Sequence, residues 1–223
     1  MRSSNRKVAA MALGQFLTLA LVAPATWAVF DEPQQAVKQE DAAPATPEAQ
    51  AALDAGLAAV RDAEDREASE GAAAGRKLSP AVKESYAKAR AKFAEATKAD
   101  PKLAQAWNGL GYSNRKLGDY KTALAAYDRA IELRSGYPEA TEYRGEAYLG
   151  LNRIEDAKQA YLDLFASNRA LADELLEGMK QWTASPGKKK ADVADLAEFV
   201  TEREKIASQT ASLTREATTQ GWN

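Results

Sequence analysis

The chain has 223 residues, of which 30 are basic and 32 acidic, and it contains no histidine and no cysteine. These absences exclude a Ser-His-Asp or Cys-His nucleophile, a thiolate zinc site, an iron–sulfur cluster and a disulfide framework. Alanine, the strongest helix former, accounts for 49 residues, so an all-α fold is expected. An all-carboxylate metal site or a carboxylate-pair hydrolase stays compatible with the composition, although the composition itself singles out neither.

Residues 1–28 have the order of a secretory signal peptide and resemble bacterial export signals. Three basic residues in the first seven positions precede an apolar run at 8–22, and small residues follow up to Ala28. An apolar run of about 15 residues is shorter than the roughly 20 that span a bilayer, so cleavage is favoured over a retained anchor. Ala28 is the predicted cleavage position and Ala25 the second choice. The predicted location is the periplasm, with secretion as the alternative, and no membrane span is expected after cleavage.

Removal of this segment leaves 27 basic and 32 acidic residues and a net charge of −5. An acidic chain lacks the basic stripe that displaces counterions from phosphates, so no nucleic-acid partner is predicted. Residues 29–48 hold prolines among Gln, Glu, Asp and Ala with few large apolar side chains, which predicts a disordered linker. A recognition peptide is the alternative interpretation of that segment.

A regular interval organises the middle of the chain. Ala89, Ala123 and Ala157 are equally spaced, and the same interval separates three aromatic residues and two glycines. The aromatic residues are Phe93, Tyr127 and Tyr161, and the glycines are Gly111 and Gly145. Gly118 and Asn152 share the interval at turns, and both residue types tolerate a left-handed backbone.

The segment from Ala106 to Tyr112, together with the periodic residues that follow it, closely resembles the tetratricopeptide repeat. A good copy with Gly145 and Tyr161 follows this segment, and a half copy with Ala89 and Phe93 precedes the segment. The resemblance implies an all-α solenoid of helical hairpins, in which small residues let two helices approach closely.

The repeats are expected to cover residues 49–167, about two and a half to three copies. Residues 53–68 are expected to supply the first helix of the first hairpin, with an inserted loop at 71–80. Trp107 and the periodic aromatic residues are predicted to fill the space between helix layers. A ligand box is the alternative interpretation of these aromatic side chains.

Two further helices are predicted after the repeats, a capping helix over 168–185 and a long helix over 188–223. Capping is the main interpretation of the long helix, and dimerisation or contact with a membrane surface are the alternatives. The run Lys188–Lys190 would favour an acidic partner or lipid headgroups in those cases. The apolar positions of the capping helix are Leu171, Leu175, Leu176, Met179 and Trp182.

Tetratricopeptide proteins bind other proteins mainly through the first helix of each repeat, so the resemblance implies a groove for a protein or peptide partner. It gives this groove eight residues, Gln105, Asn108, Tyr112, Arg115, Glu139, Glu142, Glu146 and Leu149. One half of the set is polar with a cation and the other half is acidic, which suits an extended peptide or a basic segment.

The sequence departs from the family at three positions. Gly109 and Tyr143 stand where the carboxylate-binding members of the family place asparagine, so a clamp for a peptide carboxylate is not expected. Arg144 occupies a position that is normally apolar, and it is expected either to extend outward along its aliphatic stem or to pair with a glutamate.

Glu139, Glu142 and Glu146 recur at steps of three and four residues and lie on one helix face. The main interpretation is a solvated acidic face, and the alternatives are a partner contact, a hard-cation site or an acid–base pair. No phosphate loop or activated nucleophile accompanies them, so no enzyme activity, cofactor or metal is predicted. The predicted function is a non-catalytic periplasmic adaptor. The alternative is a structural or assembly subunit of an envelope complex that acts through the long C-terminal helix, with an oligomeric state that the sequence leaves open.

Overall fold

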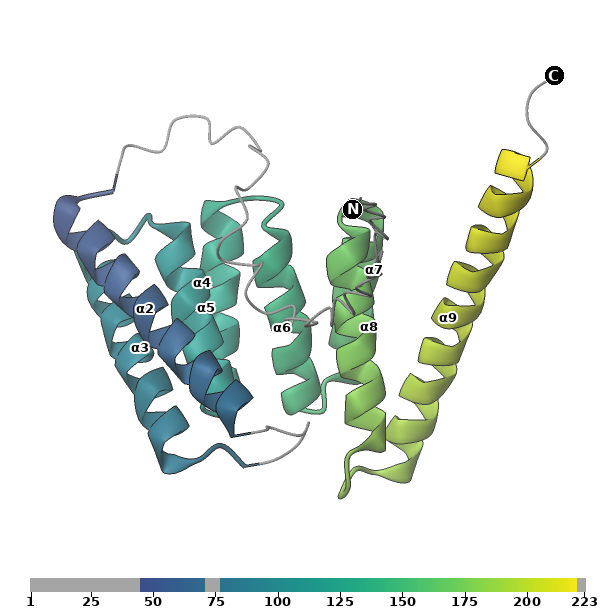
Figure 1. The fold of residues 1–223 in the computed structure, drawn as a ribbon, viewed down its shortest axis with the longest axis horizontal. Helices are drawn as coiled ribbons and strands as arrows, with labels where there is room; N and C mark the ends of the chain where they lie inside the picture. The colour runs from purple at the N-terminus through teal and green to yellow at the C-terminus, as the bar shows by residue number, and fades with distance from the viewer. Residues whose placement is uncertain (1–44, 71–76, 220–223) are drawn as a thin grey trace, which may run out of the picture. The chain divides into compact units, whose positions relative to one another are not determined.

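The computed structural model describes residues 45–70 and 77–219, with side chains described as far as residue 209. The predicted signal peptide and almost all of the predicted linker lie outside these residues. Within them the chain forms eight α-helices and no strand (Figure 1), which confirms the all-α expectation.

Consecutive helices pack in pairs, α2 with α3, α4 with α5, α6 with α7 and α8 with α9. The first helices of the pairs, α2, α4, α6 and α8, also contact one another in sequence, and we call them the first-helix layer. The partners α3, α5, α7 and α9 form the second-helix layer. The bounds are α2 Pro47–Ser69, α3 Pro80–Ala99, α4 Ala104–Lys116, α5 Tyr120–Leu133, α6 Pro138–Gly150, α7 Ile154–Ser167, α8 Arg169–Ala184 and α9 Lys190–Thr219.

Local sequence signals account for where these helices begin and turn. Ser79 and Asp119 cap α3 and α5 by accepting hydrogen bonds from backbone N–H groups of the first turn. Gly118 and Asn152 have φ angles of 85° and 60°, which confirms the left-handed turns expected at both positions. Glycine and asparagine, which tolerate a positive φ angle, therefore occupy these two helix-to-helix turns.

Aromatic rings pack against glycine where two helices of the layers meet. A Cβ added to Gly56 or Gly109 would lie 2.6 or 2.5 Å from the Phe93 ring, and one on Gly111 would lie 2.5 Å from Tyr127. Phe93 and Tyr127 are completely buried, which supports core packing over a ligand box for these rings. Each ring occupies the space that a glycine leaves open.

Trp107 does not share this environment. Its side chain is only half-buried, and its indole Nε1 donates a hydrogen bond to the Pro101 carbonyl at 3.0 Å. The expectation that Trp107 fills the space between layers is wrong to that extent, because its ring is hydrogen-bonded to the turn that precedes α4.

The first hairpin departs from the regular interval because both of its helices and the segment that joins them are longer than in the second hairpin. Helix α2 has 23 residues and α4 has 13. Gly56 lies 37 positions before the Phe93 ring that packs against it, whereas Gly111 lies 16 positions before Tyr127. The predicted helix over 53–68 lies inside α2, and the greater lengths of α2, α3 and the segment between them explain why it is out of register with the repeat.

The last two helices share a core with α7. All five predicted apolar residues of α8 are buried, and Leu196 and Val200 of α9 pack into the same cluster. Val193 and Phe199 are partly buried against it. Beyond Val200 the described side chains of α9 are exposed or half-exposed, and Thr219 is the last helical residue.

Candidate functional site

The eight predicted groove residues lie on α4 and α6, two neighbouring helices of the first-helix layer. Spacing of three or four residues places each set of four on one face of its helix. We call the surface formed by these eight residues the first-helix face.

Arg115 is the central cation of the first-helix face. Its guanidinium carbon lies 5.1 Å from the ring centroids of both Tyr112 and Tyr143. It forms an ion pair with Glu146 of α6, and its side chain is 14% exposed. Two rings and a carboxylate therefore hold this charge between α4 and α6.

Helix α2 adds two acidic residues that the spacing of the repeats does not predict. The Tyr112 hydroxyl donates to Glu64 Oε1 at 2.5 Å, and Lys116 Nζ pairs with Glu67 at 2.8 Å. Glu64 is buried, and this burial raises the pKa of its carboxyl despite the hydrogen bond from Tyr112. The irregular register of the first repeat carries no signal that would have located these contacts.

Glu142 is the buried carboxylate of the face. It is 4% exposed, and its Oε2 atom has no hydrogen-bond partner among the described residues. Burial raises its pKa well above 4.5, and Glu146 and Glu174 add to the rise against the opposing charge of Arg115. The interpretation of a solvated acidic face is wrong at this position, because α6 lies in contact with both α4 and α8.

The remaining predicted residues have different environments. Gln105 and Glu139 are half-buried, and Glu139 keeps one carboxylate oxygen without a hydrogen bond among the described residues. Asn108 is buried, and so is Leu149, whose carbonyl accepts a hydrogen bond from Trp182 Nε1 at 2.7 Å. The face is thus a mixture of buried and accessible groups.

Arg144 pairs with an aspartate of the second-helix layer instead of a glutamate. Its Nη1 atom lies 3.0 Å from Asp128 Oδ1 on α5, and its guanidinium carbon lies 5.9 Å from the Tyr148 ring. The Arg144 charge is therefore paired across the contact between α5 and α6.

A cavity of about 650 Å³ opens where α4, α6 and α8 end. It contains Arg115, Glu146 and Leu149 from the predicted set, whereas the other five predicted residues do not line it. Tyr120, Trp182 and Lys188 also line it and were not predicted as site residues.

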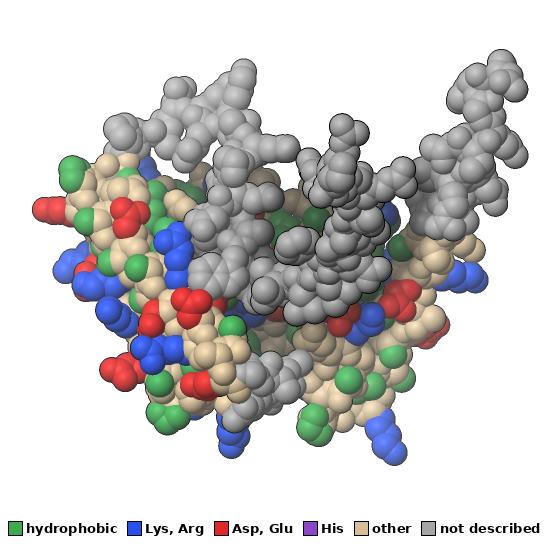
Figure 2. Space-filling model, in the orientation of Figure 1, with side chains coloured by type: hydrophobic (Ala, Val, Ile, Leu, Met, Phe, Trp, Pro, Cys, Tyr) green, Lys and Arg blue, Asp and Glu red, His purple; other side chains and the backbone are tan. Residues whose placement is uncertain are grey.

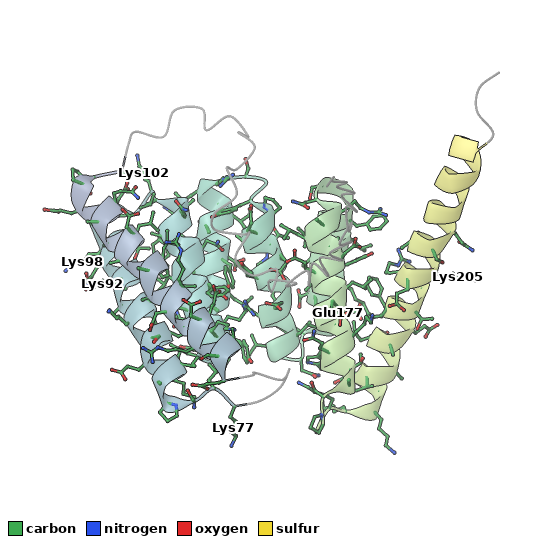
Figure 3. All side chains as sticks on the ribbon, in the orientation of Figure 1. Lys77, Lys92, Lys98, Lys102, Glu177 and Lys205 are labelled. Carbon is green, nitrogen blue, oxygen red and sulfur yellow. The ribbon has the colours of Figure 1, made fainter. Side chains whose placement is uncertain are left out.

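The charges outside the first-helix face are mixed. Figure 2 shows acidic and basic side chains interspersed over α2 and α3, and Figure 3 shows Lys92 and Lys98 extending outward from α3. Within the described ranges, no group of three or more histidine, cysteine or acidic side chains could hold a metal ion. No helix in that part of the chain is both long enough and apolar enough to cross a bilayer.

Residues 83–138 match the family model of the tetratricopeptide repeat. No curated protein matches the chain. A solved structure similar to it is the first TPR of Spaghetti (RPAP3) bound to the HSP90 peptide SRMEEVD, with 19% identity and a TM-score of 0.42 over 60% of this chain and 96% of that chain. The first TPR domain of human RPAP3 has 17% identity and a TM-score of 0.42, covering 59% and 95%. The TPR domain of Arabidopsis OM64 has 14% identity and a TM-score of 0.42, covering 56% and 94%.

Proposed function

This chain is a tetratricopeptide repeat protein, and we propose that it is a non-catalytic adaptor that binds a segment of another protein along the first-helix face. Stacked helical repeats of this kind present extended binding surfaces, which supports a protein or peptide as the class of partner. The supporting observation in this chain is Glu142, a buried carboxylate with one oxygen that has no hydrogen-bond partner among the described residues.

The acidic excess around Glu142 favours a basic segment. Glu146 and Glu174 both raise the pKa of Glu142, and Arg115 is the opposing cation that lowers it. Because Arg115 already pairs with Glu146, Glu142 has no cation of its own among the described residues, and its carboxyl keeps its proton to higher pH. A lysine or arginine of the partner supplies the missing cation, and a carboxylate that gains a cation becomes a stronger acid.

Binding of such a cation is therefore coupled to proton release. The free protein holds the Glu142 pKa high, and the bound cation lowers it, so the complex carries fewer protons than its parts. The affinity for a basic segment is therefore expected to be higher at pH 8 than at pH 6. Calorimetry of one basic peptide at pH 6 and pH 8 measures the effect.

A peptide array tests the proposal directly. Fifteen-residue peptides of random composition are incubated with the protein, and the retained peptides are scored for lysine and arginine. We expect enrichment of these residues for the unmodified chain and its loss in Glu142→Gln. Glu132→Gln, an exposed glutamate on α5, is the matched control and should keep the enrichment. Equal retention of basic and neutral peptides by the unmodified chain contradicts the proposal.

We also propose that the chain is exported to the periplasm and cleaved after Ala28. The order of basic, apolar and small residues at the start of the sequence supports this location. Intact-mass measurement of the protein from a periplasmic fraction is expected to give Val29 as the first residue. A chain that keeps the segment before Val29 and stays in the cytoplasmic fraction contradicts export.

A second candidate is a structural subunit that assembles through α9. This helix has 30 residues whereas α8 has 16, and the last described buried side chain of α9 is Val200. Truncation after residue 205 keeps the packed part and removes the extension. Loss of a larger assembly in light scattering would favour this candidate, and an unchanged mass of the truncated chain in native extracts counts against it.

A further inference from the structure

The cavity at the ends of α4, α6 and α8 adjoins the first-helix face. Arg115 and Glu146 belong to both, so a segment that lies along α6 past Glu146 reaches the cavity next. Its volume of about 650 Å³ exceeds that of one amino-acid side chain and is within the range of ligand pockets.

Aromatic walls that are already fixed in place line one part of the cavity. The Trp182 indole is held by the hydrogen bond from its Nε1 to the Leu149 carbonyl. The Tyr120 ring packs so closely on Gly150 that a Cβ there would lie 2.5 Å from it. A ligand that enters meets a preformed aromatic surface, so little further ordering of these side chains opposes binding.

The charged groups of the cavity are mainly cations. Arg115, Lys116 and Lys188 line it, and Glu146 is its one acidic residue among those described. Arg115 pairs with Glu146, and Lys116 pairs with Glu67. Lys188 has no acidic partner in the described part of the chain, and its Nζ lies 4.6 Å from the Trp182 ring centroid. A ligand that carries an anionic group next to an apolar group complements the cations and the aromatic rings of the cavity.

We propose that the cavity is a second subsite for the segment bound on the first-helix face, and that it takes a large apolar side chain flanked by a carboxylate. The apolar side chain lies against Trp182 and Tyr120, and the carboxylate pairs with Lys188. This inference rests on the proposed function, because the same segment places its cation at Glu142.

The helix geometry sets the spacing of the two features in the partner. Glu142 and Leu149 are seven positions apart on α6, which corresponds to about 10 Å along the helix axis. An extended chain covers about 3.3 Å per residue. The cation and the apolar residue are therefore separated by about three positions in the partner sequence.

Two substitutions block the subsite without removing core residues. A Cβ on Gly178 meets only Glu146, at 3.6 Å and beyond, so Gly178→Leu extends into the cavity without a backbone clash. Gly178→Ala is its matched control, since it adds only the Cβ atom. Lys188→Glu reverses the unpaired charge, and Lys189→Glu makes the same change in net charge at the next residue, which does not line the cavity.

The probes are fluorescein-labelled peptides measured by anisotropy. One contains Lys-Gly-Ser-Phe-Asp, a second has the reverse order Asp-Phe-Ser-Gly-Lys, and a third replaces Phe-Asp by Gly-Ser. We expect Phe-Asp in one of the two orders to tighten binding by about tenfold, which is about 1.4 kcal/mol. Gly178→Leu and Lys188→Glu should abolish this gain, whereas Gly178→Ala and Lys189→Glu should keep it.

The outcomes separate the subsite from the proposed function. Binding of the lysine peptide with no gain from Phe-Asp in either order overturns the subsite alone. A gain that survives in Gly178→Leu also overturns it. A Phe-Asp gain lost in the blocked variants, with no contribution from lysine, supports the subsite and overturns the basic-segment proposal. Absence of binding by all three peptides overturns both.

Discussion

The first-helix face and the outer side of the second-helix layer both carry charged residues, but the two regions use them differently. On the outer side Lys92 and Glu95 pair at 2.7 Å with exposed fractions of 36% and 56%. On the face Arg115 is 14% exposed and lies between two aromatic rings. Exposed pairs contribute little, whereas the partners of a buried charge become costly to remove. Environment therefore decides what a charge does in this protein.

Two glutamates illustrate the same difference. Glu132 forms an exposed pair with Arg129 one turn earlier on α5. Glu142 is buried, has no partner for one oxygen among the described residues, and has a raised pKa. Both positions read as acidic residues on a helix face, and only the contact of α6 with α4 and α8 distinguishes them.

The largest expected effect is that of Arg115→Ala. This change leaves the carboxylates of Glu142 and Glu146 without their cation, and it should lower the free energy of unfolding by about 3 kcal/mol. Urea titration of the purified protein measures it. A loss as small as that of an exposed arginine would show that charged residues of the first-helix face stabilise the fold no more than those of the outer side.

Tyr112→Phe is expected to have a smaller effect. It removes the hydroxyl that donates to Glu64 and leaves a buried carboxylate with one partner fewer. The expected loss is about 2 kcal/mol, measured by the same titration. Tyr120→Phe removes the same group from a half-exposed ring, so it serves as the control and should be close to neutral.

Glu142→Gln is expected to change the dependence of stability on pH. Since the pKa of Glu142 is higher in the folded chain, the folded state holds its proton to higher pH than the unfolded state. The contribution of Glu142 to the free energy of unfolding is fully present below its usual pKa of 4.5. It is lost as pH rises through the folded-state pKa.

Glutamine has no such titration, so the variant should gain stability relative to the unmodified chain between pH 5 and pH 8. Thermal unfolding across this interval measures the difference, and parallel curves for the two proteins would contradict a raised pKa. Some dependence of stability on pH should persist in the variant, because burial also raises the pKa of Glu64 and Glu174.

The smallest expected effect is that of Arg129→Ala. It removes an exposed pair three residues apart on α5, with an expected loss of less than about 0.5 kcal/mol. Urea titration beside Arg115→Ala compares the outer layer with the face directly. A loss above about 1 kcal/mol at this position would remove the contrast between them.

Much of the fold follows from local rules. Gly111 leaves room for the Tyr127 ring where their helices cross, and Gly145, one interval later, leaves room for Leu175 of α8. Gly118 and Asn152 mark turns because few residues adopt a positive φ angle. The apolar face of α8 is visible in the spacing of its leucines.

The candidate site could be predicted less completely. The eight predicted residues lie on neighbouring helices, but their burial depends on groups that are distant in the chain. Glu64 lies 48 positions before Tyr112, and Trp182 lies 33 positions after Leu149. Arg144 pairs with Asp128 on another helix, although several acidic residues were open to it.

The helical hairpins, their turns and the small residues at which they approach can be read from the chain alone, because these features depend on interactions within one or two repeats. The burial of Glu142, the place of Arg115 between two tyrosines and the cavity beside Trp182 emerge only when the helices are assembled. Burial and charge compensation depend on the packing of whole helices against one another, and no single repeat contains those contacts.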